Sequence, residues 1–385
     1  MATALKPKMV QTMLNFGSSR AGKESSSSPQ LIRQDPEDTR NNTHEDGEDT
    51  GMDYEMEHES KLDSQSSLTS SDWPPSPSTA PTPTRTRTPV SEAMQRRRIL
   101  RCIAGETSTF LPGILETTPW APPKGYLYSP RNVSELHPKY CPSFSKTAVR
   151  VLNADTLDTA IGLANCAQYV TVRDKKPVCV LNMANAYTAG GGWKNGALAQ
   201  EETLCYRTSL SFTLKLRYYP LNDLQAIYSP TVLVIRKSID EGHGLLSLTK
   251  PEKLPVISTV SIAALCEPKL SIKTVSVPNS SDTRMKEIFQ DRNDRDLTKD
   301  KIRMVLRTAA FNGHRRLVLG ALGCGAFLNP REEVADCFAE VFREREFSGG
   351  WWESIIFAVM DDLGEGENGD GNYGVFYRKL HGMMI

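Results

Sequence analysis

Residues Val178–Leu210 read VCVLNMANAYTAGGGWKNGALAQEETLCYRTSL, and this stretch decides the fold. It starts as an apolar run typical of a strand buried on both faces. Three glycines, Gly190 to Gly192, follow it, and seven residues later QEE opens a segment with helical spacing. Glycines let a backbone take positive φ and approach a ligand closely, and the N–H groups of such loops bind diphosphates. The order of elements indicates a phosphate-binding site.

Two adjacent glutamates, Glu201 and Glu202, begin the helical segment. An arbitrary pair in this place complements the helix dipole and needs no other explanation. Directly after a phosphate loop, acid chemistry is the stronger interpretation. Since a helical turn takes about 3.6 residues, the two side chains point about 100° apart and should have different roles.

The rest of the chain alternates strands with helices. We expect strands at Val149–Leu152, Pro177–Met183, Thr231–Arg236, Val256–Ala264, Arg316–Leu319 and Ser354–Val359. We expect helices at about 92–105, ending before Pro112, and at Leu157–Tyr169, Glu201–Leu216, Asp296–Phe311 and Pro330–Phe347, with a loop or insertion at 236–253. This alternation predicts an α/β fold with a mixed, mostly parallel sheet between helical layers. Ligands of such sheets bind beyond the carboxyl ends of the strands.

The spacing of GGG and QEE, preceded by LNxAN, resembles the signature of the microbial-type poly(ADP-ribose) glycohydrolases. Val149–Ala164 resembles the family's first strand and the loop after it, and Leu317–Pro330 (LVLGALGCGAFLNP) resembles its second phosphate-binding loop. The resemblance covers residues 95 to 384. It implies a three-layer α/β/α macrodomain-like fold and cleavage of ribose–ribose bonds in poly(ADP-ribose).

The resemblance also implies roles for single residues. Glu202 is expected to be the catalytic acid and base, Glu201 to fix ribose hydroxyls, and Gln200 to support the loop. Asn185 is expected to bind the distal ribose, although an asparagine in this place can merely close an Asx turn. The other residues expected to bind substrate are Gly190, Gly191, Gly192, Gly323, Cys324, Gly325, Ala326, Phe327 and Asp155.

Two of these residues keep an alternative interpretation. Phe327 ends the second loop, and its ring is expected against the reacting ribose, whereas most aromatic residues belong to the core. Asp155 follows the first strand, where macrodomains commonly recognise the adenine amino group with an aspartate. As the N-cap of a helix, Asp155 would need no further role.

Glycosidic cleavage needs an acid for the leaving oxygen and a base for water. By the resemblance, Glu202 fills both roles in turn, while the diphosphate of the substrate helps to stabilise positive charge on the ribose. For this to work at neutral pH, desolvation or the charge of Glu201 must raise the pKa of Glu202. The chemistry requires no metal or cofactor, and the sequence has no metal-ligand spacing.

The chain departs from the family pattern at two ligand-facing positions. The family usually has proline before the glycines, where this chain has Ala189, and often glycine after GAF, where it has Leu328. Other residues receive structural interpretations. His314 is expected in a solvated turn and Cys205 as a buried thiol. The basic cluster of Arg96, Arg97, Arg98 and Arg101 is expected on the polar face of the first helix, and a nuclear-import element is the alternative.

Composition divides the chain into a tail and one domain. Residues 1–91 are rich in Ser, Thr, Pro and acidic residues and should be disordered; residues 92–385 should form the glycohydrolase domain, with a helical extension at about 92–145. A net charge of zero gives no reason to expect DNA binding. The eight scattered cysteines favour a reducing compartment, nucleus or cytoplasm, and no apolar run is long enough for a membrane span.

The expected partners are poly(ADP-ribose) or ADP-ribosylated proteins, with the chain itself a monomer. Two other functions stay open. A binding module that reads ADP-ribose without turning it over would need the phosphate loops but not the QEE carboxylates. An enzyme of another specificity would remove mono-ADP-ribose from protein side chains or phosphate from ADP-ribose 1″-phosphate.

Overall fold

A computed structural model of the chain describes residues 89–164, 176–276 and 282–385, with the side chains of 89–91 and 164 left aside. Residues 1–88 of the predicted disordered tail lie outside the described residues, as does the end of the helix predicted at Leu157–Tyr169, whereas residues 89–91 are already helical. Within the described residues, no helix is both long and apolar enough to cross a bilayer.

A seven-stranded sheet runs through the described part of the domain, in the order β1-β4-β5-β3-β8-β9-β2. Its strands are β1 (Tyr126–Tyr128), β2 (Arg150–Leu152), β3 (Cys179–Ala184), β4 (Ala226–Leu233), β5 (Val256–Ala263), β8 (Arg316–Leu319) and β9 (Ser354–Ala358). The five strands from β5 to β2 are parallel to one another. Beyond β5, β4 pairs antiparallel with β5, and the edge strand β1 pairs antiparallel with β4. The predicted mixed, mostly parallel sheet is confirmed.

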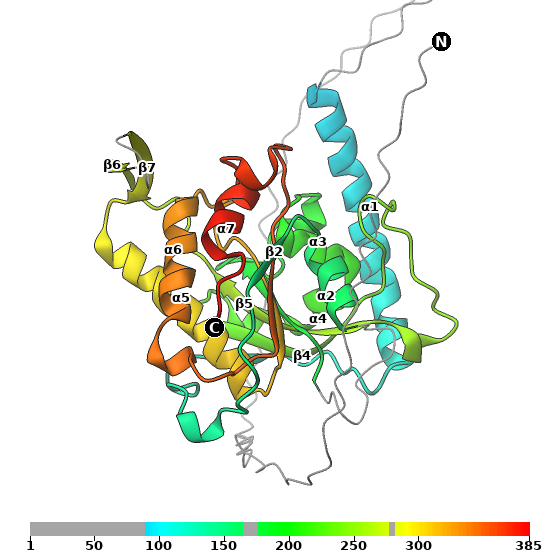
Figure 1. Ribbon diagram of the computed structural model, residues 1–385. Coiled ribbons are helices and arrows are strands. Elements are labelled where there is room, and N and C mark those ends of the chain that lie inside the picture. Colours follow the sequence, from blue (N-terminus) through cyan, green and yellow to red (C-terminus); the bar gives the residue numbers. More distant parts are fainter. Residues whose placement is uncertain (1–88, 165–175, 277–281) are drawn as a thin grey trace, which may run out of the picture. The chain divides into compact units, whose positions relative to one another are not determined.

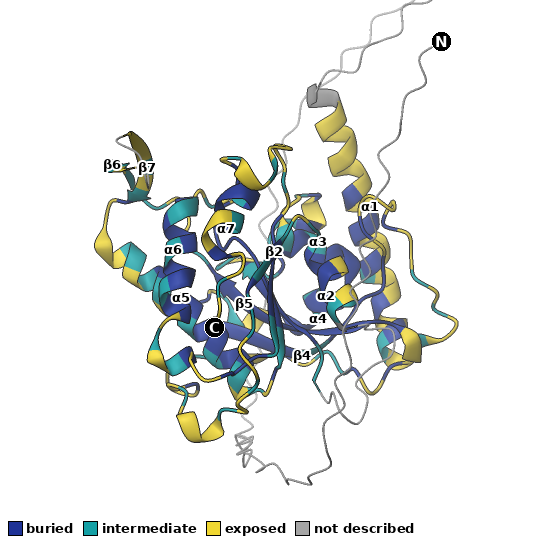
Figure 2. Cartoon of the chain, in the orientation of Figure 1, coloured by how far each residue is buried: buried dark blue, intermediate teal, exposed yellow. Residues whose placement is uncertain are grey.

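Helices cover both faces of the sheet (Figure 1). They are α1 (Pro89–Glu116), α2 (Thr156–Ala164), α3 (Gln200–Arg207), α4 (Leu210–Thr213), α5 (Arg292–Phe311), α6 (Arg331–Phe342) and α7 (Asn372–Leu380). The alternation of β3 shows how the layers form. Cys179 and Leu181 pack in the core beneath α5, α6 and α7, whereas Val178 and Val180 pack in the core shared with α1 to α4. Figure 2 shows the buried sheet between these layers.

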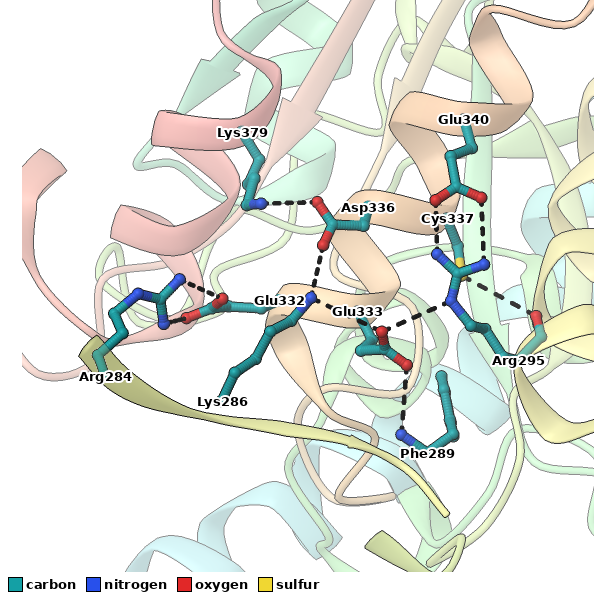
Figure 3. Close-up of polar contacts among 10 residues, drawn as sticks. All are labelled: Arg284, Lys286, Phe289, Arg295, Glu332, Glu333, Asp336, Cys337, Glu340 and Lys379. Atoms are coloured by element: carbon teal, nitrogen blue, oxygen red, sulfur yellow. Dashed lines mark hydrogen bonds and ion pairs between the residues drawn. The ribbon is translucent and has the colours of Figure 1, made fainter. Parts of the chain in front are cut away.

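A two-stranded hairpin, β6 (Leu270–Ser276) and β7 (Thr283–Phe289), was not predicted. Most of its residues are exposed, so its sequence lacks the apolar period that reveals a core strand. Ion pairs hold it to α6 (Figure 3): Arg284 contacts Glu332 at 2.5 Å and Lys286 contacts Asp336 at 2.7 Å. The hairpin follows β5 in the chain. It lies against α6, which is the helix that follows the loop after β8.

Several predicted helix ends are wrong: the helix predicted at Pro330–Phe347 ends at Phe342, and the one predicted from Asp296 begins at Arg292. Two others have a clear physical reason. Helix α1 continues through Pro112 to Glu116 because the buried Leu111 and Ile114 pack in a small core with β4 and β5. The helix predicted at Glu201–Leu216 ends at Arg207, since Thr208 is extended and forms a bridge with Val234.

The expectation that His314 lies in a solvated turn is also wrong. Its ring is buried, with Nε2 2.9 Å from the hydroxyl of Tyr228 and Nδ1 3.0 Å from the carbonyl oxygen of Pro177. Because that carbonyl can only accept, Nδ1 carries the ring proton. Burial lowers the pKa of His314 to about 4, so the ring is a neutral core group.

Candidate active site

The site begins at the carboxyl end of β3, in the middle of the sheet. Strand β8 pairs with β3 only at Cys179 and Val180. Beyond that point the carboxamide of Gln200 takes the place of the missing strand: Oε1 accepts from the N–H of Met183 at 2.9 Å, and Nε2 donates to the carbonyl of Leu181 at 2.6 Å. Gln200 thus ties the start of α3 to the strand end that leads into the glycine loop.

Asn185 is the first residue after β3, and it shapes the loop. Its Oδ1 accepts from the N–H groups of Tyr187 at 2.8 Å and Thr188 at 2.9 Å, which is the Asx turn considered above. Its own N–H donates to Oε2 of Glu201 at 2.7 Å. A ribose contact by Asn185 stays a prediction, and its structural role in the loop is evident.

The glycine loop wraps around the two glutamates. Gly190 and Gly191 have φ of 77° and 59°, the left-handed region that favours glycine. A Cβ on Gly191 would lie 2.4 Å from Oε1 of Glu202. The N–H of Gly192 donates to that same oxygen at 2.9 Å. The loop therefore needs glycine in order to approach the carboxylates, and the N–H of Gly192 is directed at Glu202 rather than outward.

Glu201 is the deeper of the two acids. It is 3% exposed and Glu202 is 9% exposed. Oε1 of Glu201 accepts from Nδ2 of Asn182 at 3.2 Å, and Asn182 in turn donates to Ser261 of β5 at 3.0 Å. Burial, with a smaller contribution from the charge of Glu202, raises the pKa of Glu201 to about 8, although donation from Asn185, Asn182 and Gly190 partly offsets it. The two adjacent acids thus have different environments, as expected from their positions on the helix.

Helix α1 braces the far side of the glycine loop. Arg97 and Arg101, one turn apart, donate through Nε to the carbonyl of Asn195 at 2.9 and 3.2 Å. Gly196 lies so close to α1 that a Cβ there would be 2.2 Å from the carbonyl oxygen of Arg97. From the inside, the hydroxyl of Tyr206 lies 2.9 and 2.7 Å from the carbonyl oxygens of Trp193 and Ala197, which share its single proton. The loop is fixed from both sides.

The second loop follows β8, the strand next to β3. Asn329 closes it: the two protons of its Nδ2 are shared among three carbonyl oxygens, those of Leu265, Gly323 and Phe327. In the described residues, the N–H groups of Gly325, Ala326 and Phe327 donate to no protein acceptor. These N–H groups are the ones that could bind an anion. Gly323 and Cys324 are buried beneath them, and burial raises the pKa of the Cys324 thiol.

Phe327 and Leu328 form the exposed end of this loop. Phe327 is half-buried and so is not the core aromatic of the alternative interpretation. Leu328 has φ of 53°. This left-handed conformation favours glycine, the residue that the resemblance led us to expect here, and in this chain a leucine adopts it.

Asp155 caps a helix, as its alternative interpretation proposed. Its Oδ1 accepts from the N–H groups of Leu157 and Asp158 at 2.8 and 3.0 Å, at the start of α2. The same oxygen contacts the buried guanidinium of Arg207 at 2.6 Å. Arg207 also pairs with Asp158 at 2.6 Å, so it connects α3 to α2. A contact of Asp155 with adenine stays a prediction.

The structure thus brings the two glutamates, Gln200, Asn185 and the first glycine loop into one network at the end of β3. The second loop lies at the end of the neighbouring strand. The thiol of Cys205 is fully buried, and burial raises its pKa well above the ordinary value, as expected of a structural cysteine. In the part of the chain that the structure describes, no cluster of His, Cys, Asp or Glu could hold a metal ion.

A cavity of about 660 Å³ lies elsewhere, between α1 and the turn at 242–245. Arg98, Glu106, Arg236 and His243 line it, and none of the predicted site residues does. We place the candidate site at the glutamates, because in the described part of the chain it is there that buried carboxylates meet a glycine loop.

Four residues of the site were missed by the sequence argument: Asn182, Tyr206, Arg207 and Arg101. Asn182 carried a usable signal, since a polar residue inside a continuously apolar strand must find a buried partner. The partners of Arg101 and Arg207 lie far away in sequence, and those of Tyr206 lie in the glycine loop, whose path no local pattern reveals.

The architecture is that of a macrodomain-like α/β protein with an acid pair beside a glycine loop. Residues 120–237 match the family model described as microbial-type PARG, catalytic domain. The fold is similar to that of poly(ADP-ribose) glycohydrolase from Thermomonospora curvata, with 25% identity, coverage of 73% of this chain and 98% of that chain, and a TM-score of 0.56.

The structure of that protein bound to the inhibitor ADP-HPD is similar at 25% identity, with 72% and 98% coverage and a TM-score of 0.54. No curated protein matches the sequence. The findings confirm the predicted resemblance to the microbial-type poly(ADP-ribose) glycohydrolases and the macrodomain-like fold.

Proposed function

We propose that the chain is a glycohydrolase that cleaves ribose–ribose bonds of poly(ADP-ribose) and releases ADP-ribose, with Glu202 as its acid and base. The family match over 120–237 and the likeness to a poly(ADP-ribose) glycohydrolase crystallised with an inhibitor support the reaction. The observation that carries the role of Glu202 is its place between the glycine loop and the surface: Oε1 is held by Gly192 N–H at 2.9 Å, and the side chain is the more exposed of the pair.

The roles of the two glutamates follow from their contacts. With Oε1 of Glu202 fixed by the loop, Oε2 carries the proton to the leaving 2′-oxygen as the glycosidic bond breaks. The attacking water then gives a proton back to Glu202 while its oxygen bonds to the anomeric carbon. Glu201, fixed by Asn185 and Asn182, orients the ribose hydroxyls. The free N–H groups of Gly325 to Phe327 bind the diphosphate, whose charge lies near the developing cation.

The test uses the full chain and its Glu202→Gln variant with labelled poly(ADP-ribose), and separates products by chromatography. We expect ADP-ribose from the unchanged chain only, and ADP-ribose affinity of the variant within a few fold. Turnover by Glu202→Gln at a near-normal rate would remove Glu202 from the acid role. No product from either protein, with tight ADP-ribose binding by both, would make the chain a reader. Release of ADP-ribose only from mono-ADP-ribosylated protein would establish the other specificity.

We further propose that residues 92–385 form one catalytic domain, with α1 as an integral part. Each cysteine in the described residues is a free thiol, and burial raises the thiol pKa at Cys179 and Cys337. Free thiols fit a reducing compartment, and we propose the nucleus or cytoplasm as the location and a monomer as the state. Fractionation of cells and sedimentation of the purified chain test the two points.

A further inference from the structure

Large apolar side chains are exposed on three consecutive loops at the carboxyl edge of the sheet. Tyr187, on the loop after β3, is 78% exposed, and Leu328, on the loop after β8, is 60% exposed. Met360 and Leu363 follow β9 and are 50% and 63% exposed. Because β3, β8 and β9 are parallel neighbours in that order, the three loops leave the same edge of the sheet from adjacent strands. We call these four residues the apolar row.

The first two members are presented by constrained backbone. The N–H of Tyr187 is fixed by Oδ1 of Asn185 at 2.8 Å, and the carbonyl of the preceding residue, Ala186, accepts from Leu221 N–H at 2.7 Å. Leu328 is in the left-handed region, and its N–H donates to Gly325 at 3.0 Å. Single exposed apolar residues are ordinary on protein surfaces, but a row on neighbouring loops beside a ligand site indicates a binding surface.

We propose that Tyr187 stacks on the adenine of the second ADP-ribose unit of the substrate, which is joined through the cleaved bond to the unit held by the glutamates and glycine loops. Leu328 and the rest of the apolar row lie beside this adenine. The inference rests on the proposed function and extends it to the second unit of the substrate. A polymer of ADP-ribose continues past the site that the glutamates and loops form, and every unit carries a base. An exposed tyrosine ring is a surface on which any base can stack. A polypeptide carrying one ADP-ribose is the alternative occupant.

The test compares binding of one unit with binding of the polymer, in a background that does not turn over. We measure the Kd of Glu202→Gln and of Glu202→Gln/Tyr187→Ala for ADP-ribose and for poly(ADP-ribose). Stacking of one base on an aromatic ring corresponds to about 5- to 150-fold in affinity. We therefore expect the tyrosine substitution to raise the Kd for the polymer by such a factor and to leave the Kd for ADP-ribose within twofold.

Two further variants make the result specific. Tyr187→Phe keeps the ring and should retain polymer affinity within twofold. Tyr126→Ala is the matched control: Tyr126 is an exposed tyrosine, 42% accessible, on β1 at the edge of the sheet, with β4 and β5 between it and β3. It should change neither Kd.

The outcomes are distinguishable. If removal of the Tyr187 ring leaves the affinity for the polymer unchanged, the proposal is overturned. It is also overturned if the affinity for ADP-ribose falls by the same factor as the affinity for the polymer, because that result would place the ring at the first unit. A loss seen only with mono-ADP-ribosylated protein assigns the row to polypeptide and also overturns it. Absence of ADP-ribose release by the unchanged chain contradicts the proposed function separately, because the binding comparison does not need turnover.

Discussion

Replacing Glu201 by glutamine should stabilise the protein, and increasingly so as the pH rises. The carboxyl is 3% exposed, and burial raises its pKa from 4.5 to about 8. The folded state therefore holds a proton that the unfolded chain gives up at pH values above about 4.5. Between about pH 4.5 and 8, each pH unit costs the folded protein about 1.4 kcal/mol, and above pH 8 the loss levels off at no more than about 5 kcal/mol.

Glutamine keeps the shape and removes the titration. Its carboxamide oxygen can accept from Asn185 N–H. Its amide can donate to Oδ1 of Asn182, an atom with no hydrogen-bond partner in the structure, once the Asn182 carboxamide turns over, because Nδ2 of Asn182 now faces Glu201. Near pH 5 the two proteins should differ little, since the difference in the protonation of Glu201 between the folded and unfolded states is small there. By pH 8 the variant should be more stable by about 2 to 5 kcal/mol.

The assay is urea unfolding of both proteins at one-unit steps from pH 5 to pH 9. Other titrating groups are common to the two proteins, so the difference between their free energies of unfolding isolates Glu201. Its slope should approach that of one proton up to about pH 8 and then flatten. A pH-independent difference, or a variant that loses stability as the pH rises, would show that Glu201 is ionised in the folded protein and would refute the reasoning.

Two further predictions concern backbone geometry. Gly196→Ala places a Cβ 2.2 Å from the carbonyl oxygen of Arg97 at a φ of 76°. It should lower the free energy of unfolding, measured by thermal denaturation, by about 3 kcal/mol or more. Gly313→Ala is the matched control, with a φ of 73° and nothing within 4 Å, and should lower it by only about 1 to 2 kcal/mol. Equal losses would mean that α1 moves freely away from the loop. Leu328→Gly relieves a left-handed leucine but loosens the unfolded chain, so its melting temperature should stay equal or rise by an amount that corresponds to about 1 kcal/mol at most; a clear fall would show that the exposed leucine side chain stabilises the fold.

The sequence predicted most of the elements that lie in the core, but it missed α7, although Val375, Phe376 and Leu380 of that helix are buried. Strand β8 was predicted with its observed bounds, and the two-sided burial of β3 was evident from its continuous apolar run. The hairpin β6–β7 is held by ion pairs with α6, and charged contacts leave no periodic pattern. Helix α3 was predicted too long, because its end is set by pairing of Thr208 with Val234, far along the chain.

The site was predicted in its parts but not in its connections. The glycines and the glutamates were identifiable from their spacing. The pattern did not show that Gly192 N–H would serve Glu202, or that Asn185 would bond to Glu201, since both contacts depend on the three-dimensional path of the loop. Burial raises the pKa of Glu201, the deeper of the two acids, and this was not predicted.

The contacts between α1 and the glycine loop limit how short a folded, active fragment of this protein can be. The family match begins at residue 120, after α1 has ended at Glu116. A fragment started at that boundary would remove Arg97 and Arg101 from the carbonyl of Asn195 and expose the apolar surface that Leu100 covers. The glycine loop of such a fragment would lose its contacts with α1. Weak activity of the fragment would therefore reflect the missing helix and not the activity of the whole domain. Trimming for crystallisation or expression should leave the whole of α1 in place.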